Sequence, residues 1–278
     1  MMKITGTTKL GMVIGSPITG SLSPIIHNAA IEHLNLNAIF TAFALKENNF
    51  ISFLKAVEDL NLFGISVTMP LKQVAAESLQ TTEIARRLNA VNAIYKKDGN
   101  LIGDNTDGQG FIKAMKAKYD FDPKDKTIFL YGAGGAARAI ALALTLSGSK
   151  NIFIFNRSKE KINNINNISQ ACIGVENLQR AESVDLIVNC TSLGMANTEN
   201  SDIDPFKSVD FNDSQLIFDI VTTPVVTPLI KHAKDQGAKT VEGYYMLIFQ
   251  AVLAFEHFSG VPAPTEIMIS ALEEHFGA

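Results

Sequence analysis

The sequence predicts an α/β protein with two domains, and two observations support this fold class. Short apolar runs typical of buried strands alternate with segments of helical periodicity along most of the chain. One of these runs, at residues 127–131, leads into a glycine-rich turn and then an alanine-rich helix. With 278 residues, 46% of them hydrophobic, the chain is long enough for two domains that each bury a core.

The first predicted strand covers residues 10–15, and a loop rich in hydroxyls and turn-forming residues follows it. Pro24 then opens a helix that continues to about residue 34. Ser21 and Ser23 alternate around Leu22 just before this helix, so both hydroxyls can face one way beside its N-terminus. Such a pair suits a carboxylate ligand. The alternative is that one serine caps the helix and the other belongs to the turn.

A strand at 38–45 and a helix at about 48–60 come next, and residues 64–72 then form a strand, a proline turn and a helix start. Lys72 lies in the first helical turn after Pro70, where the helix dipole disfavours a cation. This unusual placement is suited to general acid–base chemistry. The alternative is an ordinary solvated lysine.

A helix from about residue 82 and a hairpin that turns at Asp98 and Gly99 complete the first domain. Polar side chains then gather at residues 104–107, where a strand passes into a helix. Asp107 either belongs to a functional cluster at this strand end or is simply the N-cap of the helix. We place the end of the first domain at residue 106 and the start of a cofactor domain at Asp107.

The glycine-rich turn after residues 127–131 matches the pattern G-x-G-x-x-A at Gly132, Gly134 and Ala137. The first glycine permits a tight turn, the second lets the backbone approach a pyrophosphate, and the small third residue allows close helix packing. The helix that follows directs its free N–H groups and the positive end of its dipole at that group. The turn therefore predicts a Rossmann-type doubly wound dinucleotide-binding domain, although the pattern alone also occurs in ordinary strand–helix turns.

The next predicted strand, residues 151–155, ends in the segment that distinguishes the two nicotinamide cofactors. An NAD site places an acidic residue here to accept hydrogen bonds from the ribose 2′-hydroxyl. This chain instead has Asn156, Arg157, Ser158 and Lys159. A guanidinium with neighbouring hydroxyl and ammonium donors suits a 2′-phosphate, so we expect NADP. The alternative is that Arg157 and Lys159 are only the solvated start of a helix.

Two further buried strands are predicted at 185–189 and 215–219, and the first runs into the polar segment 191–195. In a doubly wound sheet these strand ends line the cofactor crevice. Helices at about 228–235, 243–258 and 265–276 are predicted for the last part of the chain.

Composition excludes several classes of function. A formal net charge of -4 provides no electrostatic footprint for nucleic acid or an anionic membrane. Two cysteines without metal-ligand spacing support neither a disulfide framework nor a zinc site, and we expect no metal. We find no pattern of a signal peptide and no apolar stretch that could span a bilayer, so we expect a cytoplasmic protein with a small-molecule substrate.

These segments together resemble the shikimate dehydrogenase family along nearly the whole chain. The motifs that carry the resemblance are GSPITGSLSPIIHN at 15–28, SVTMPLK at 66–72, NAVNA at 89–93, GDNTDGQG at 103–110, YGAGGAARA at 131–139, NRS at 156–158, TSLGM at 191–195 and EGYYMLIFQAVLAFE at 242–256. Their order and spacing make the resemblance specific. It implies an N-terminal substrate domain at 1–106 completed by C-terminal helices at 243–278, an NADP-binding domain at 107–242, and an active site in the cleft between them.

The resemblance implies the NADPH-dependent, reversible reduction of 3-dehydroshikimate to shikimate, a step of chorismate and aromatic amino-acid biosynthesis. Lys72 and Asp107 match the catalytic acid–base pair. The implied substrate-binding residues are Ser21 and Ser23 for the carboxylate, Thr68, Asn92 and Gln250 for the ring hydroxyls, and Asp107 and Thr222 beside them. The implied cofactor-binding residues are Gly132, Ala133, Gly134, Gly135 and Ala136 for the pyrophosphate, Asn156, Arg157, Ser158 and Lys159 for the adenosine phosphate, Ile220 and Gly243 for the nicotinamide end, and Glu83.

The chain departs from the family pattern at several positions. These are Gly20 where the family usually has His, Ser66 for Asn, Asn89 for Gly, Ala93 for Thr, Thr222 for Tyr and Phe258 for Trp. Ser66 and Thr222 lie nearest the substrate in the implied cleft. Loss of one neutral hydrogen bond there costs about 0.5–1.5 kcal/mol, so we expect KM to change more than the type of reaction.

Two other functions remain open from the sequence. A related enzyme that oxidises quinate would use the same serine pair and the same lysine and aspartate. A catalytically weak NADP(H)-binding regulator is disfavoured, because a sensor needs neither Lys72 nor Asp107 as a proton donor. Family members occur as monomers or homodimers, and the sequence does not separate these states.

Overall fold

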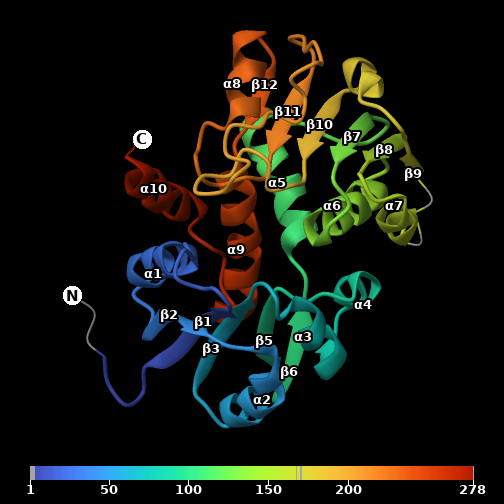
Figure 1. Cartoon of the computed structure of the whole chain (residues 1–278). Helices are drawn as coiled ribbons and strands as arrows, with labels where there is room; N and C mark the ends of the chain where they lie inside the picture. Colours follow the sequence, from blue (N-terminus) through green and yellow to red (C-terminus); the bar gives the residue numbers. More distant parts are fainter. Residues whose placement is uncertain (1–3, 167, 170, 278) are drawn as a thin grey trace. The chain divides into compact units, whose positions relative to one another are not determined.

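The computed structural model describes residues 4–166, 168–169 and 171–277, and the chain divides into two compact units (Figure 1). The first unit is formed by Met1–Thr106 together with Gln250–Ala278, and the second by Asp107–Phe249. Helix α9 (Gly243–Ser259) contributes residues to both, because the division falls between Phe249 and Gln250.

The first unit is built on a six-stranded mixed sheet with the order β2-β1-β3-β5-β6-β4. Its strands are β1 (Lys9–Gly15), β2 (Ala38–Ala44), β3 (Leu62–Val67), β4 (Gln80–Thr81), β5 (Ala93–Lys97) and β6 (Asn100–Asp104). β1 pairs in parallel with β2 and β3, whereas β5 runs antiparallel to both β3 and β6. The predicted hairpin turns at Asp98 and Gly99, which both have positive φ, as a tight two-residue connection requires.

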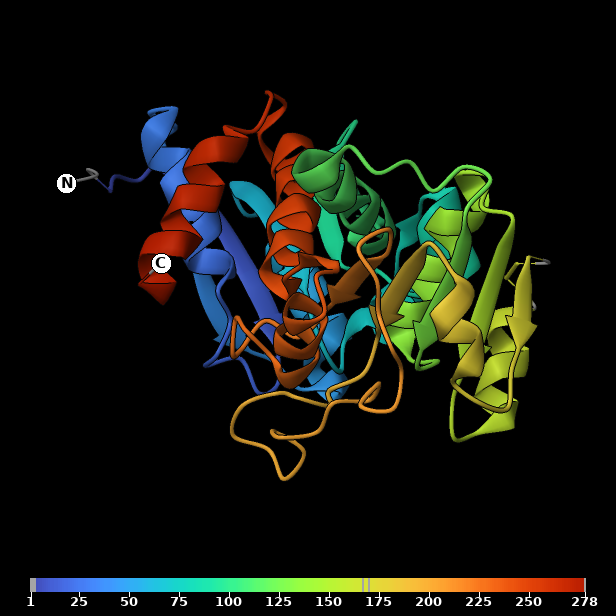
Figure 2. The same ribbon diagram turned by 90° about the horizontal axis from the view of Figure 1, so that it is seen from above.

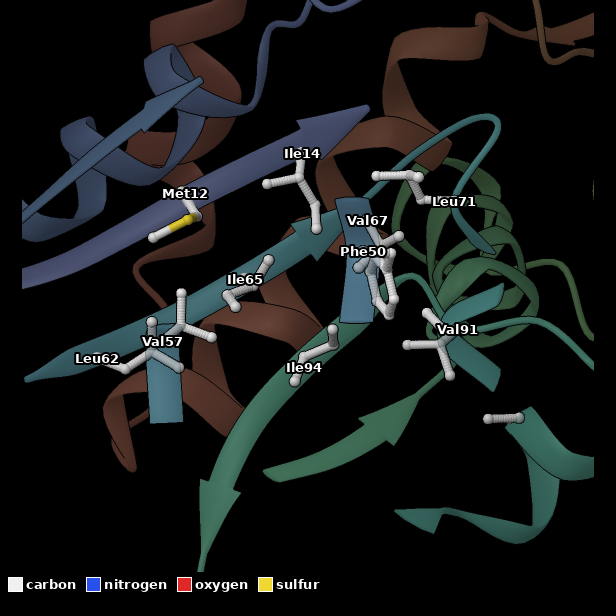
Figure 3. Packing of buried hydrophobic residues seen from close by; sticks show 12 residues of the cluster. Met12, Ile14, Phe50, Val57, Leu62, Ile65, Val67, Leu71, Val91 and Ile94 are labelled. Atoms are coloured by element: carbon white, nitrogen blue, oxygen red, sulfur yellow. The ribbon is translucent and has the colours of Figure 1, made fainter. Parts of the chain in front are cut away.

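Helices cover both faces of this sheet. They are α1 (Ser23–His33), α2 (Phe50–Glu58), α3 (Lys72–Ser78), α4 (Glu83–Leu88), the end of α9, and α10 (Thr265–Phe276). Under α2 and α3, the fully buried ring of Phe50 packs with alternate residues of β1 and β3, such as Ile14 and Ile65 (Figure 3). On the other face, Phe63 of β3 packs edge-on against Phe255 and Phe258 of α9. Each Å² of apolar surface that these two layers remove from water stabilises the fold by about 25 cal/mol.

The second unit is an all-parallel sheet with the strand order β12-β11-β10-β7-β8-β9. Its strands are β7 (Thr127–Tyr131), β8 (Asn151–Phe155), β9 (Cys172–Gly174), β10 (Leu186–Asn189), β11 (Leu216–Asp219) and β12 (Lys239–Val241). In chain order this is the 3-2-1-4-5-6 arrangement of a doubly wound dinucleotide-binding domain. The predicted α/β fold class with a Rossmann-type domain is therefore confirmed.

The helices of the second unit are α5 (Asp107–Tyr119), α6 (Gly135–Leu146), α7 (Lys159–Asn166), α8 (Pro228–Asp235) and the start of α9. Gly108 lets α5 approach α6 closely, since a Cβ at this position would overlap the carbonyl oxygen of Ala139. Residues 190–215, between β10 and β11, form turns and extended loops (Figure 2). Among residues 4–166, 168–169 and 171–277, we find no helix that is both long and apolar enough to cross a membrane.

Three short strands were not predicted from the sequence: β4, β9 and β12. Two or three residues are too few to show the alternation that identifies a strand. The helix expected at 48–60 also differs, because Glu47–Asn49 form a 3₁₀ turn and α2 begins at Phe50. The remaining predicted elements agree with the structure to within a few residues.

Candidate functional site

The predicted substrate residues of the first unit follow strand ends at one edge of its sheet. Parallel pairing of Ile14 with Val67 places the carboxyl ends of β1 and β3 together. The antiparallel pairings bring the start of β5 and the end of β6 to the same edge, since Ala93 lies opposite both Ser66 and Asp104. The predicted residues that follow or precede these ends are Ser21, Ser23, Thr68, Lys72 and Asn92.

Asn92 and Gln250 lie in one hydrogen-bonded cluster. The Nδ2 of Asn92 donates to Oε1 of Gln250 at 3.2 Å and to Oγ1 of Thr106 at 3.0 Å. Thr106 in turn donates its backbone N–H to Oδ1 of Asn92 at 2.8 Å and its hydroxyl to the carbonyl oxygen of Gln250 at 3.0 Å. Residues separated by 158 positions in the chain are thus brought together with fixed side-chain orientations.

Thr106 is a residue that the sequence analysis missed. It is 3% exposed and joins the amide side chain of Asn92 to the backbone carbonyl of Gln250. Its place immediately before Asp107, in the polar run GDNTDGQG, was the signal that could have identified it.

Lys72 is placed by the turn that follows β3. The N–H of Thr68 donates to the carbonyl oxygen of Ile14 at 2.9 Å, which ties this turn to the end of β1. Lys72 is the first residue of α3, as predicted, and its carbonyl oxygen accepts the N–H of Val91 at 2.8 Å. The lysine backbone is therefore fixed beside the segment that carries Asn92.

The two serines lie at the start of α1, and neither caps it through its side chain. The residue before the helix is Leu22, and it forms no side-chain cap. The Oγ of Ser21 instead accepts the N–H of Ser23 at 3.4 Å, and Ser23 is 7% exposed. Part of the alternative is therefore seen, because Ser21 belongs to the turn and binds the first N–H of the helix, and the carboxylate-binding interpretation stays a prediction.

The predicted cofactor residues of the second unit follow the carboxyl ends of its parallel strands. Asn189 at the end of β10 pairs with both Tyr131 at the end of β7 and Asp219 at the end of β11. The segments that leave this edge carry Gly132, Ala133, Gly134, Gly135 and Ala136 after β7, Asn156, Arg157, Ser158 and Lys159 after β8, Ile220 and Thr222 after β11, and Gly243 after β12. Ligands of doubly wound sheets bind at this edge.

The turn after β7 has the properties required for a pyrophosphate. Gly132 has φ +112°, and a Cβ there would lie 2.8 Å from Cγ2 of Thr191. Around Gly134 and Gly135 the space is open, because a Cβ at either position would meet nothing within 4 Å beyond its chain neighbours and the backbone of its own helix. No side-chain cap occupies the start of α6, so its first N–H groups face this space with the positive end of the helix dipole. The residues present therefore fit a dinucleotide.

The basic segment after β8 contains two cations in different settings. Lys159 lies 2.7 Å from Oε1 of Glu176 in an exposed ion pair, and this hydrogen bond and charge raise the pKa of the lysine. The side chain of Arg157 is exposed, and Nδ2 of Asn156 donates to the carbonyl oxygen of Ser158 at 2.9 Å. The helix start of the second interpretation is seen, since α7 begins at Lys159, and binding of the 2′-phosphate by this segment stays a prediction.

The other predicted site residues are distributed between the units. Glu83 belongs to the first unit and forms an exposed ion pair with Arg86, one turn further along α4. Asp107 belongs to the second unit and is the first residue of α5, where the helix dipole favours a negative charge. Gly243 packs against the backbone of Ile220 and Val221 so closely that a Cβ would overlap it.

Asp219 and its hydrogen-bond partners form a buried polar network that the sequence analysis did not predict. Asp219 is 0% exposed, and burial raises its pKa to about 6. Its carboxylate binds the side chains of Asn189 and Thr227. The signal for this network was present in the sequence, because both Asn189 and Asp219 end short apolar strands with a polar residue.

Comparison with known proteins assigns a family to this arrangement. Three family models match: the shikimate dehydrogenase substrate binding domain at residues 13–94, shikimate / quinate 5-dehydrogenase at 114–244, and the shikimate 5′-dehydrogenase C-terminal domain at 243–273. The shikimate dehydrogenase (NADP(+)) of Streptococcus mutans is 37% identical, over 99% of each chain.

Solved structures show the same similarity. A shikimate dehydrogenase crystallised with NADP⁺ matches with a TM-score of 0.89 and 34% identity, covering 99% of this chain and 98% of the other. The Listeria monocytogenes shikimate 5-dehydrogenase, in complex with shikimate and NAD, matches with a TM-score of 0.89 and 30% identity, covering 98% and 99%.

Proposed function

This chain belongs to the shikimate dehydrogenase family, and we propose that it catalyses the NADP-dependent, reversible reduction of 3-dehydroshikimate to shikimate. It is an oxidoreductase that acts in the shikimate pathway and uses NADP as its cofactor. The observation that carries the proposal is the similarity to NADP(+)-dependent shikimate dehydrogenases over nearly the full length of both chains.

Bound NADPH supplies the hydride, and the other tasks fall to the side chains of this protein. We assign Lys72 and Asp107 as the acid–base pair, which holds a proton for the oxygen that becomes the new hydroxyl. A cation beside that oxygen also stabilises its developing negative charge. Each of these roles accelerates such reactions by about 10²- to 10⁴-fold.

We assign substrate recognition to the polar groups at the edge of the first sheet. Ser21 and Ser23 supply hydroxyl donors for the carboxylate, and Thr68 contacts a ring hydroxyl. Asn92 and Gln250 contact the other hydroxyls, and their mutual hydrogen bond orients both before the substrate arrives. The assigned substrate domain comprises residues 1–106 and 243–278, with Asp107 and Thr222 contributed by residues 107–242. Thr222 supplies a shorter side chain than the tyrosine expected there.

We assign NADP to the carboxyl edge of the second sheet, within residues 107–242. The turn from Gly132 to Ala136 holds the pyrophosphate, and its open space and uncapped helix support this assignment. Arg157, with Asn156, Ser158 and Lys159, binds the 2′-phosphate. Ile220 and Gly243 lie at the nicotinamide end, and Glu83 is assigned a further cofactor contact. We also propose a cytoplasmic enzyme that acts as a monomer or homodimer.

Replacing Arg157 with alanine is expected to remove the preference for NADP over NAD. A charge-assisted hydrogen bond contributes about 1.5–3 kcal/mol, which corresponds to a rise of about 10- to 100-fold in KM for NADP⁺. The KM for NAD⁺ should change less than threefold. Steady-state kinetics with each cofactor at saturating shikimate measure both values.

The matched control is Lys161→Ala, which removes an exposed cation from α7. It should leave both KM values unchanged. Equal rises in the KM for NADP⁺ in Arg157→Ala and Lys161→Ala would indicate that the overall positive charge of this segment attracts the cofactor, without a phosphate contact at Arg157.

The proposed function is tested by the initial rate of NADP⁺ reduction, followed by NADPH absorbance, with shikimate and with quinate. We expect turnover with shikimate at a kcat/KM at least tenfold above that with quinate. A higher kcat/KM with quinate would identify the chain as a quinate dehydrogenase, which the name of one matching family model includes. Binding of NADPH without turnover of either substrate would favour the regulator instead.

A further inference from the structure

A single buried carboxylate joins three elements at the carboxyl edge of the second sheet. Oδ1 of Asp219 accepts from Nδ2 of Asn189 at 2.9 Å and from the N–H of Val221 at 3.1 Å. Oδ2 accepts from the hydroxyl of Thr227 at 2.6 Å. Thr227 caps α8, because its Oγ1 also accepts the N–H of Ile230 at 3.2 Å. The ends of β10 and β11 and the start of α8 are thus held by one side chain.

The network continues from Asn189 to the glycine-rich turn. Oδ1 of Asn189 accepts from the hydroxyl of Thr191 at 2.7 Å and from its N–H at 3.1 Å, and Nδ2 donates to the carbonyl oxygen of Leu193 at 3.2 Å. The methyl group of Thr191 then occupies the space beside Gly132 where a Cβ would lie. The position of Thr191 therefore limits how the pyrophosphate turn can move.

The other branch of the network reaches the segment assigned to the nicotinamide end. The hydrogen bond from Val221 fixes the backbone just after β11. Gly243 packs directly on the carbonyl groups of Ile220 and Val221, so this backbone also defines where α9 begins. One carboxylate therefore orients the segments assigned to both the pyrophosphate and the nicotinamide.

We propose that Asp219 is a positioning residue for NADP. It holds the pyrophosphate turn and the Ile220–Val221 backbone in fixed positions relative to each other. The inference rests on the proposed function. Asp219 does not need to touch the cofactor, because its hydrogen bonds act through Asn189, Thr191 and Val221. Prior orientation of the binding groups lowers the cost of ordering them when the ligand binds.

The buried surroundings of Asp219 explain why its role is to orient the groups that it binds. Burial is the largest influence on its carboxyl group and raises the pKa to about 6, and the nearby Asp204 acts in the same direction. Asp204 is itself hydrogen-bonded to Nδ1 of His232, and the buried thiol of Cys190 also interacts electrostatically with Asp219. A buried charge of this kind is weak evidence for stability. Its contribution lies in the three directed hydrogen bonds.

The test measures NADPH affinity from the fluorescence of the bound nicotinamide in Asp219→Ala and Asp219→Asn. We expect Asp219→Ala to raise the Kd at least tenfold, as misplaced binding groups do. Asp219→Asn keeps an amide oxygen that accepts from Val221, so its Kd should lie between those of Asp219→Ala and the wild type. At saturating NADP⁺, the KM for shikimate should rise much less than the NADPH Kd, because all of its assigned residues except Asp107 and Thr222 belong to the first unit.

Asp185→Asn is the matched control, because this carboxylate lies just before β10, at the opposite edge of the same sheet. It binds Lys126 and the N–H of Thr127, and its side chain is 38% exposed. We expect its NADPH affinity to equal that of the wild type.

The possible outcomes separate this inference from the proposed function. Wild-type binding with an unchanged Kd in Asp219→Asn and Asp219→Ala would overturn the inference alone. Equal rises in the NADPH Kd and the shikimate KM would do the same, since they would indicate general damage. If Asp219→Ala does not fold, the Kd of Asp219→Asn decides. Absence of NADPH binding by the wild type would overturn both the proposed function and the inference.

Discussion

Replacing Lys72 with alanine is expected to lower kcat for shikimate oxidation by about 10²- to 10⁴-fold. The substitution removes the ammonium group assigned to hold the proton and to stabilise charge on the reacting oxygen. The affinity for NADPH should stay within about twofold of wild type, because Lys72 belongs to the first unit and the glycine-rich turn to the second. Initial rates at saturating substrate and a separate NADPH titration measure the two effects.

Two further variants show whether this loss comes from a specific pair. Lys55→Ala removes an exposed lysine from α2 and should leave kcat unchanged. Asp107→Asn should cost about as much as Lys72→Ala, and the double variant should be little worse than either, because residues that act as a unit are not additive. A Lys72→Ala enzyme with more than a tenth of the wild-type kcat would contradict the assignment.

The strands of the second unit could be predicted because each local signal agrees with the topology. β7, β8, β10 and β11 are apolar runs of four or five residues that end at a polar or aromatic residue. Connections from a strand through a helix to a parallel strand have a fixed handedness. The glycine-rich turn identifies β7 as the first strand of the domain. The expectation that the cofactor binds at the carboxyl edge follows from this order alone.

The polar residues of the two networks stand out in the sequence, but their hydrogen bonds could not be predicted, because they join residues that are far apart in the chain. Asn92 meets Gln250 across 158 positions, and Asp219 meets Asn189 across 30. Sequence patterns describe neighbours within one turn or one strand, whereas these contacts depend on how strands are ordered in the sheet. Thr106 illustrates the difference: it looks like one polar residue in a loop, but it is buried and bonded to the side chain of Asn92 and the backbone of Gln250.

His27 shows the opposite case, in which a polar residue of a recognised motif belongs to an apolar core. Its ring stacks on Phe40 with centroids 4.2 Å apart, and Phe258 and Phe255 lie at 5.7 and 6.1 Å. Within the part of the chain that the structure describes, neither ring nitrogen has a hydrogen-bond partner. Burial lowers the pKa of His27 from 6.5 to about 3, so the folded protein keeps this ring neutral.

Acid is therefore expected to destabilise the first unit through His27. Below pH 6.5 the unfolded chain binds a proton at this residue, while the folded chain does not until about pH 3. Stability decreases as the pH is lowered wherever the unfolded state binds more protons, so the loss begins near pH 6.5 and continues down to about pH 3. At 1.36 kcal/mol per pH unit, about 3 kcal/mol is lost between pH 6.5 and pH 4.

His27→Phe is expected to abolish this part of the acid sensitivity, because it keeps an aromatic ring in the stack and cannot take up a proton. Urea unfolding at pH 7 and pH 4 should show that the variant loses about 3 kcal/mol less stability than the wild type between these values. At pH 7 the variant should be at least as stable, since an unpaired buried polar group costs about 1–3 kcal/mol. His27→Leu tests whether the extra volume of phenylalanine matters.

The difference in stability loss between His27→Phe and the wild type isolates the contribution of His27 from that of carboxylates that titrate in the same pH range. Asp219, with its raised pKa, acts in the opposite direction, because the folded state binds the proton first and gains stability as the pH falls through about 6. His275→Phe is the matched control, because this histidine is exposed near the end of α10 and remains hydrated in both states. If His27→Phe and wild type lost the same stability between pH 7 and pH 4, the ring of His27 would have to bind a proton without unfolding.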